Sequence, residues 1–114
     1  HMIEQIPPSA LPDWLATVTG DQLPLLLDVR EPAEWQAASV QPAGAELLQM
    51  SMHTIPARLG ELDPDRPVAV LCHHGVRSQH VAAFLAHHGF ERVANVVGGI
   101  DAWSVQADPT VPRY

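Results

Sequence analysis

The one cysteine of the sequence, Cys72, and the arginine that follows it closely, Arg77, are the first candidates for chemistry. A cysteine thiolate is a nucleophile, and a guanidinium group is a fixed cationic fork that suits oxyanions. Gly75 lies between the two residues and lets the backbone turn tightly. A lone cysteine has a second common interpretation, as a small apolar residue that fills the core. The elements around Cys72 decide between these two interpretations.

The length of the segment between Cys72 and Arg77 separates two reactions of a nucleophile beside an anion site. The thiolate can attack the central atom of an oxyanion, as in a cysteine phosphatase or an arsenate reductase. Alternatively, it can attack the outer sulfur of a donor and become a persulfide. Cysteine phosphatases place one more residue between cysteine and arginine, whereas only four intervene here. The smaller ring fits one added sulfur atom better than a phosphate, so sulfur chemistry is favoured.

Two apolar runs are typical of buried strands, and each ends beside polar residues. The run over 67–72 ends at the cysteine and precedes a helix expected over 78–88. N–H groups converge at such a helix start, and the helix dipole adds partial positive charge, which favours a thiolate. The run over 25–29 ends beside Asp28 and Arg30. Ligands bind at the carboxyl ends of parallel strands, so both ends are expected at the site.

Strand and helix patterns alternate along the chain, which predicts an α/β fold with a central, mostly parallel sheet flanked by helices on both faces. We expect residues 1–114 to form one domain, with His1 left over from cloning. Ser9 is the expected N-cap of the first helix, and Gly89 is expected to follow the helix of the cysteine loop. The other expected elements are strands over 3–6, 45–48 and 93–97, helices over 9–18, 32–37, 52–62 and 100–103, and an extended tail over 108–114.

Charge and composition exclude several classes of partner. The formal net charge is −7, with six arginines and no lysine, which disfavours nucleic acid as a ligand. No apolar run approaches the roughly 20 residues that span a bilayer, so no membrane partner is expected. No signal peptide is visible, which favours a cytoplasmic location. A single cysteine permits no intramolecular disulfide.

These residues also resemble a known family. The chain is similar to single-domain rhodaneses, the thiosulfate sulfurtransferases, over nearly its whole length. The resemblance lies in the segments 28–31 with Glu34 and Trp35, 72–77 with Ser78, 97–103, and 109–114. One segment departs from it, because 38–45 keeps Gly44 and Ala45 but lacks the Gly-His-Ile that many members have there.

The resemblance implies roles for individual residues. Cys72 would be the nucleophile that forms a persulfide, with no metal or organic cofactor. Sulfur would come from thiosulfate or a similar anion and pass to cyanide or a thiol, or to a sulfur-relay protein. Asp28 and Arg30 would help to frame the loop. The loop residues would bind the substrate, with their amides around the added sulfur and the arginine facing the donor anion: His73, His74, Gly75, Val76 and Arg77.

Three questions stay open at this point. The imidazoles of His73 and His74 could act as acid–base groups, or only the backbone of these residues could matter. A metal site made of Cys72, His73, His74 and His80 is disfavoured, because adjacent histidines rarely converge on one ion. The domain could also be a binding or sulfur-relay module that takes sulfur only from a partner protein and has no turnover with small donors.

Overall fold

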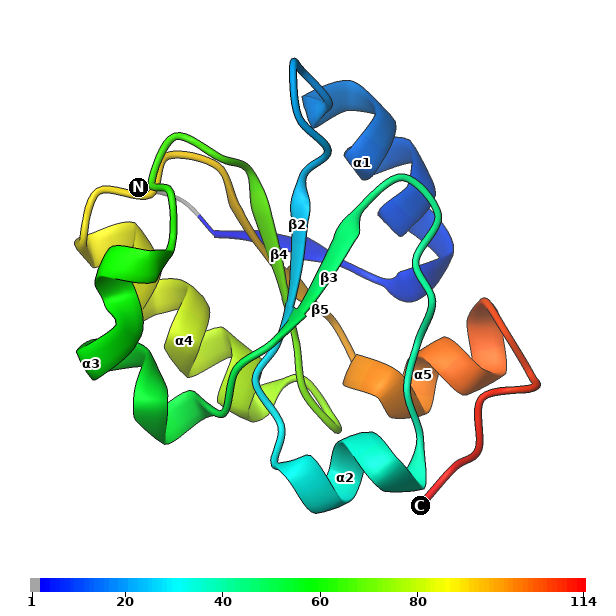
Figure 1. Ribbon diagram of the computed structural model, residues 1–114. Helices are drawn as coiled ribbons and strands as arrows, with labels where there is room; N and C mark the ends of the chain where they lie inside the picture. Colours follow the sequence, from blue (N-terminus) through cyan, green and yellow to red (C-terminus); the bar gives the residue numbers. More distant parts are fainter. Residues whose placement is uncertain (1–2) are drawn as a thin grey trace.

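The computed structural model describes residues 3–114, which contain one five-stranded parallel sheet (Figure 1). His1, the expected cloning remnant, lies outside the described residues. The strand order is β1-β5-β4-β2-β3, so β4 occupies the centre of the sheet and every pairing is parallel. The strands are β1 (Glu4–Ile6), β2 (Leu25–Asp28), β3 (Glu46–Gln49), β4 (Val68–Leu71) and β5 (Val93–Val96).

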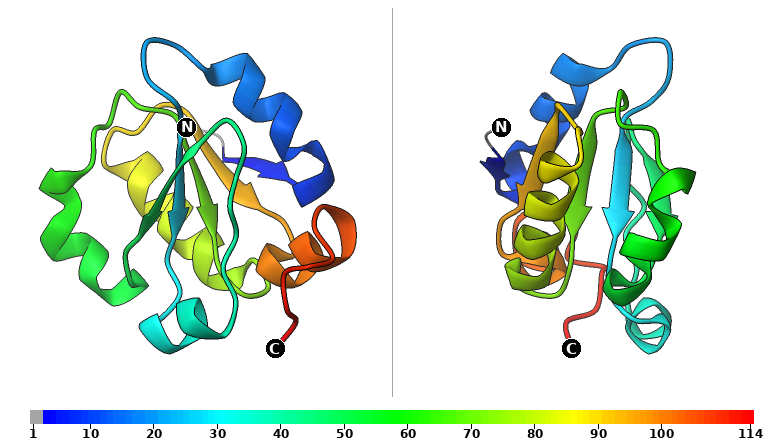
Figure 2. Two further views of the ribbon diagram at one scale, coloured as in Figure 1. Left: turned by 45° about the vertical axis from the view of Figure 1, so that its right-hand side comes forward. Right: turned by 90° about the vertical axis from the view of Figure 1, so that its left-hand side faces the viewer.

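Helices cover both faces of this sheet (Figure 2). On one face, α1 and α5 pack against alternate strand residues such as Leu26 and Leu71. On the other, α3 and α4 pack against residues such as Leu27 and Val70. Burial on both faces explains why β4 and the first three residues of β2 are continuous apolar runs. The helices are α1 (Leu11–Val18), α2 (Pro32–Ala37), α3 (Ile55–Arg58), α4 (Val76–His87) and α5 (Gly99–Gln106), with 3₁₀ turns η1 (Pro8–Ala10), η2 (Met52–Thr54) and η3 (Leu59–Glu61).

One end of the sheet collects most of the polar residues singled out above. The loop after β4, the start of α4, helix α2, the start of α5 and the C-terminal segment all gather where the strands finish (Figure 1). This is the carboxyl end of every strand, because the sheet is entirely parallel. No helix in the described part of the chain is long and apolar enough to cross a membrane.

The predicted fold class is confirmed, and some element boundaries were wrong. Ser9 lies within η1 and does not cap α1, whose N-cap is Ala10. The helix expected over 52–62 is three short pieces, η2, α3 and η3. Pro56 has no N–H to continue an α-helix from residue 52, which accounts for the break. The helix of the cysteine loop begins at Val76, two residues earlier than expected.

Candidate active site

Cys72 follows the central strand β4 directly, and its side chain is only 1% exposed. Its Sγ accepts a hydrogen bond from the backbone N–H of Gly75 at 3.0 Å. Gly75 has φ +98°, a left-handed conformation that a β-carbon would strain, and this turn brings the N–H back to the sulfur. A Cβ there would also lie 3.0 Å from the backbone N of Gly98. The glycine expected to curl the loop therefore does so.

The start of α4 lies immediately beyond this turn. The helix has 12 residues and begins at Val76, so its positive end is at the loop that carries Cys72. Val76 itself is 65% exposed, and its side chain points to solvent rather than to the core. The loop thus offers a negatively charged sulfur both a direct N–H donor and a favourable helix dipole.

A buried polar network lies beneath the sulfur. The thiol of Cys72 donates to Oγ of Ser78 at 3.2 Å, and Ser78 donates in turn to Oδ1 of Asn95 at 2.5 Å. Asn95 Nδ2 donates to the carbonyl of Gly75 at 3.2 Å and to Oε1 of Gln5 at 3.0 Å. Asn95 therefore braces the loop and orients the Ser78 hydroxyl. Asn95 was not among the predicted site residues, although an amide within the buried strand β5 was an available signal.

The turn between β5 and α5 is hydrogen-bonded to the backbone of the cysteine loop. The N–H groups of Ile100 and Asp101 donate to the carbonyls of Cys72 and His73 at 2.9 and 3.1 Å. Gly99 lies so close to these two carbonyls that a Cβ would collide with both. The Gly98-Gly99 pair, in which both residues have positive φ, thus permits a close backbone contact in addition to the tight turn between β5 and α5.

Arg77 makes a bidentate ion pair with Glu34 of α2. Its Nη1 and Nη2 donate to the two carboxylate oxygens at 2.7 and 2.8 Å. The Arg77 guanidinium, together with a hydrogen bond from Tyr114, lowers the pKa of Glu34 to about 2, against the opposing effect of burial. The same pair raises the pKa of Arg77. Glu34 also completes the capping box of α2 with Glu31. That Arg77 faces a donor anion stays a prediction.

Asp28 and Arg30 are fully buried and join the site through Tyr114. Arg30 uses all five of its N–H donors: on the Asp28 carboxylate, on the carbonyls of Glu34 and Ala38, and on Tyr114 Oη. Tyr114 Oη then donates to Glu34 at 2.8 Å. Asp28 and Arg30 therefore support Glu34, the partner of Arg77, and the Arg30 side chain has no N–H left for a substrate.

The imidazole of His73 is sandwiched between two other rings. It stacks on His74 at 3.9 Å and on Tyr114 at 4.0 Å between centroids. Burial, and then the charge of His74, lower the pKa of His73. Within residues 3–114, the hydrogen bonds at Cys72 Sγ involve Gly75 and Ser78 and neither imidazole. This arrangement favours a packing role for the His73 ring, and His74 is exposed beside it.

The comparisons with known proteins agree with this geometry. A family model described as a rhodanese-like domain matches residues 11–106. The chain belongs to this family. It is 39% identical over 110 residues to a sulfurtransferase of Allochromatium vinosum, covering 96% of each chain. It is 36% identical over 109 residues to the probable adenylyltransferase/sulfurtransferase MoeZ of Mycobacterium tuberculosis, covering 96% of this chain but only 26% of MoeZ.

A solved structure shows the same fold. The rhodanese-like domain protein of Staphylococcus aureus superposes with a TM-score of 0.75 at 24% identity, covering 98% of this chain and 99% of that one. The match confirms the α/β fold of a rhodanese-like domain, with its parallel sheet and helices on both faces. The predicted family is likewise confirmed.

One further cluster in this rhodanese-like domain brings together potential metal ligands. A ring nitrogen of His73, one of His74 and a carboxylate oxygen of Asp101 lie within 4.8 Å of one another. The Asp101 carboxylate is held by Arg113 at 2.9 and 3.1 Å, and the two imidazoles are stacked face to face. Stacked rings direct their nitrogen lone pairs along parallel planes rather than at one point. We therefore assign these groups to packing and an ion pair.

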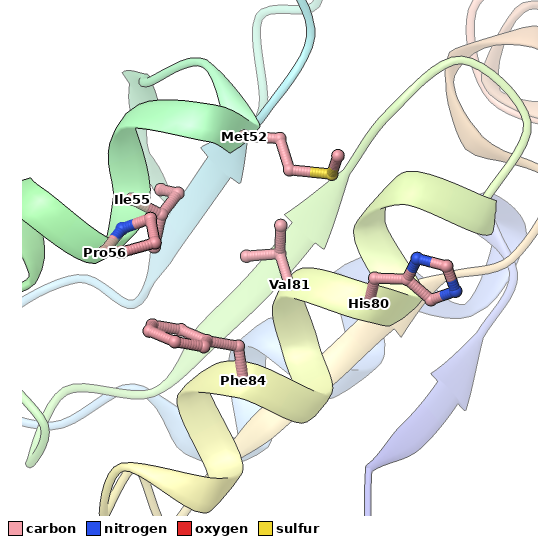
Figure 3. A pocket seen from close by; sticks show the side chains of 6 residues that line it. All are labelled: Met52, Ile55, Pro56, His80, Val81 and Phe84. Carbon is pink, nitrogen blue, oxygen red and sulfur yellow. The ribbon is translucent and has the colours of Figure 1, made fainter.

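One apolar groove of the domain is lined by residues outside the cysteine loop. It has a volume of about 220 Å³ and runs between α3 and α4 (Figure 3). Residues 72–77 are not among the described residues that line it. Its walls are formed by Met52, Ile55, Pro56, His80, Val81 and Phe84. His80, one of the ligands of the disfavoured metal site, thus belongs to this groove.

Proposed function

We propose that this rhodanese-like domain is a sulfurtransferase that carries sulfane sulfur as a persulfide on Cys72. The observation that carries the proposal is the position of Sγ, which accepts the Gly75 N–H at the positive end of α4. A persulfide places a second, negatively charged sulfur at this point. The four residues between Cys72 and Arg77 form a smaller ring than that of cysteine phosphatases, which favours one added sulfur atom. The name of the Allochromatium vinosum relative supports the same activity.

The proposed reaction has two displacement steps. The thiolate of Cys72 attacks the outer sulfur of thiosulfate or a similar donor, the S–S bond of the donor breaks, and sulfite leaves with the electron pair. A thiolate acceptor or cyanide then attacks the outer sulfur of the persulfide. The second S–S bond breaks, and Cys72 returns as a thiolate. No metal or organic cofactor enters either step. We place this chemistry in the cytoplasm, where thiols stay reduced.

The second candidate is a sulfur-relay module. In this case Cys72 receives sulfur from a partner protein and passes it on, with negligible turnover on small donors. The resemblance to MoeZ favours this alternative, because the matched part is only 26% of a longer protein that is also named an adenylyltransferase. The two candidates share the persulfide and differ in its source.

Intact-mass measurement tests the persulfide directly. After incubation with thiosulfate, the protein is expected to gain the mass of one sulfur atom, and cyanide should remove it as thiocyanate. Cys72→Ala should show neither signal, while His87→Gln, at the end of α4, serves as the matched control. A protein that gains sulfur only from a persulfidated partner supports the relay. Hydrolysis of an aryl phosphate without any sulfur uptake would contradict both candidates.

A further inference from the structure

The cation of the cysteine loop is already neutralised. Arg77 shares both of its terminal nitrogens with the Glu34 carboxylate at 2.7 and 2.8 Å. Glu34 is fixed from two further sides, by the backbone N–H of Glu31 at 3.1 Å and by Tyr114 Oη at 2.8 Å. The ion pair is therefore built into α2 and the C-terminal segment. A substrate that reaches the loop meets a paired charge and not a free cation.

The other arginines at this end of the sheet are likewise paired with groups of the protein. Arg30 is fully buried, and all five of its N–H donors are used within the protein. Arg113 is held by the Asp101 carboxylate at 2.9 and 3.1 Å. Arg92 lies at the opposite end of the sheet, since its carbonyl bonds the N–H of Val68 at the start of β4.

The imidazole of His73 does not replace the missing positive charge. His73 is stacked between two rings and stays neutral near pH 7, because burial and the neighbouring His74 lower its pKa. The carboxylates of Glu34 and Asp101, which pair with Arg77 and Arg113, also lie around the loop, and the whole chain carries a formal charge of −7. The Gly75 N–H and the start of α4 thus supply positive potential directly at Cys72.

The charge of the transition state depends strongly on the donor. Attack of the Cys72 thiolate on thiosulfate brings a monoanion and a dianion together, so the reacting group carries three negative charges. Attack on an alkyl persulfide, R–S–SH, carries a single negative charge, or two if the persulfide is ionised. A site whose arginines are paired stabilises the second reaction far better than the first.

We propose that the preferred sulfur donor of Cys72 is an alkyl persulfide with an uncharged organic group, and that a dianion such as thiosulfate reacts more slowly. This inference rests on the proposed sulfur transfer and narrows its substrate class. The thiolate attacks the terminal sulfur of R–S–SH and the S–S bond breaks. R–S⁻ leaves with the electron pair, and Cys72 becomes Cys–S–SH with no net oxidation. The exposed Val76 offers an apolar contact for the organic group.

The test compares two donors on the full chain. Persulfide formation on Cys72 is followed by intact mass after a quench with a neutral alkylating agent, using 2-hydroxyethyl persulfide or thiosulfate. Each rate is divided by the rate at which the same donor gives sulfur to a small free thiol. We expect the normalised rate to favour the persulfide by about tenfold or more, an effect of the size that local charge has on anion reactions. An equal or higher normalised rate with thiosulfate would overturn the inference.

A charge variant checks the cause. Glu34→Gln removes the negative partner of Arg77 and should raise the thiosulfate rate relative to the persulfide rate by roughly fivefold. Glu61→Gln removes one charge from an exposed ion pair on η3 and should leave the ratio unchanged. A ratio that Glu34→Gln does not raise contradicts the role of the ion pair. Circular dichroism establishes that both variants are folded.

Salt dependence of the unmodified protein gives a second test that needs no variant. With a net charge of −7 and a paired Arg77, added salt should leave the thiosulfate rate unchanged or increase it by screening repulsion. A thiosulfate rate that falls steeply with salt would show an attractive site and overturn the inference. If neither donor places sulfur on Cys72, sulfur transfer from small donors itself fails, and that result is separate from a preference for thiosulfate.

Discussion

The hydroxyl of Ser78 lies 3.2 Å from Sγ of Cys72 and accepts a hydrogen bond from the thiol, because its own O–H donates a hydrogen bond to Asn95. Once Cys72 is charged, the hydroxyl can rotate and donate to sulfur. Ser78→Ala removes that donor and should slow persulfide formation by roughly tenfold, about the value of one hydrogen bond to a charged group. Single-turnover mass measurements give the rate. Thr17→Ala, which removes a hydroxyl from α1, is the matched control. An unchanged rate in Ser78→Ala would refute the role of Ser78.

The second prediction concerns Gly99, which lies against the carbonyls of Cys72 and His73. Gly99→Ala would force the loop and α5 apart, and it would also place alanine at φ +60°. We expect a loss of about 2 kcal/mol or more in the free energy of unfolding, together with a slower reaction at Cys72. Gly20→Ala, where a Cβ meets nothing within 4 Å, is the control for chemical denaturation. Similar stability of the two variants would contradict the close contact.

Acid should weaken the fold through Glu34. Its pKa in the folded protein is about 2 and its ordinary value is 4.5, so the folded state holds this carboxylate ionised. The stability that the ion pair with Arg77 contributes is complete above about pH 4.5 and is lost as the pH falls toward 2. The loss should be roughly 2 kcal/mol. Urea unfolding across this pH range measures it. The Glu34→Gln variant should not show this loss of unfolding free energy at low pH, whereas Glu61→Gln should still show it.

Tyr114 links the two arginines of the site and can be dissected in two steps. Tyr114→Phe removes the hydroxyl that joins Arg30 to Glu34 but keeps the ring on His73. Tyr114→Ala removes both. We expect the phenylalanine variant to lose about 1–2 kcal/mol of unfolding free energy, because Arg30 keeps a buried N–H without its partner. The alanine variant should lose more. Equal losses would show that the stacking contact contributes nothing.

Local signals were sufficient for much of the architecture. Pro32 at the helix start and Glu34 in the capping box lie within one turn of each other, and α2 was predicted at its observed bounds. The apolar runs of β2 and β4 identified two of the strands that are buried on both faces. Cys72 and Gly75 were found in the same way, because a strand end, a glycine and a helix follow one another directly along the chain.

The side-chain contacts of the site could not be predicted from neighbouring residues in the sequence. Arg77 and Glu34 are 43 positions apart, and Arg30 and Tyr114 are 84 apart. The tail expected to be extended over 108–114 brings the Tyr114 ring onto His73. These contacts depend on the strand order, which places the carboxyl ends of β2, β4 and β5 together.

The difference between what the sequence predicted and what only the fold determined follows from how far apart in the chain the interacting residues lie. Secondary structure and the nucleophile depend on neighbours within a few residues, so composition, periodicity and spacing predict them. The charge state of the site depends on which carboxylate pairs with Arg77, and that pairing exists only after α2 and α4 pack at one end of the sheet. Chain order therefore identified Cys72 and its loop, whereas the folded arrangement determined that the arginine beside it is neutralised.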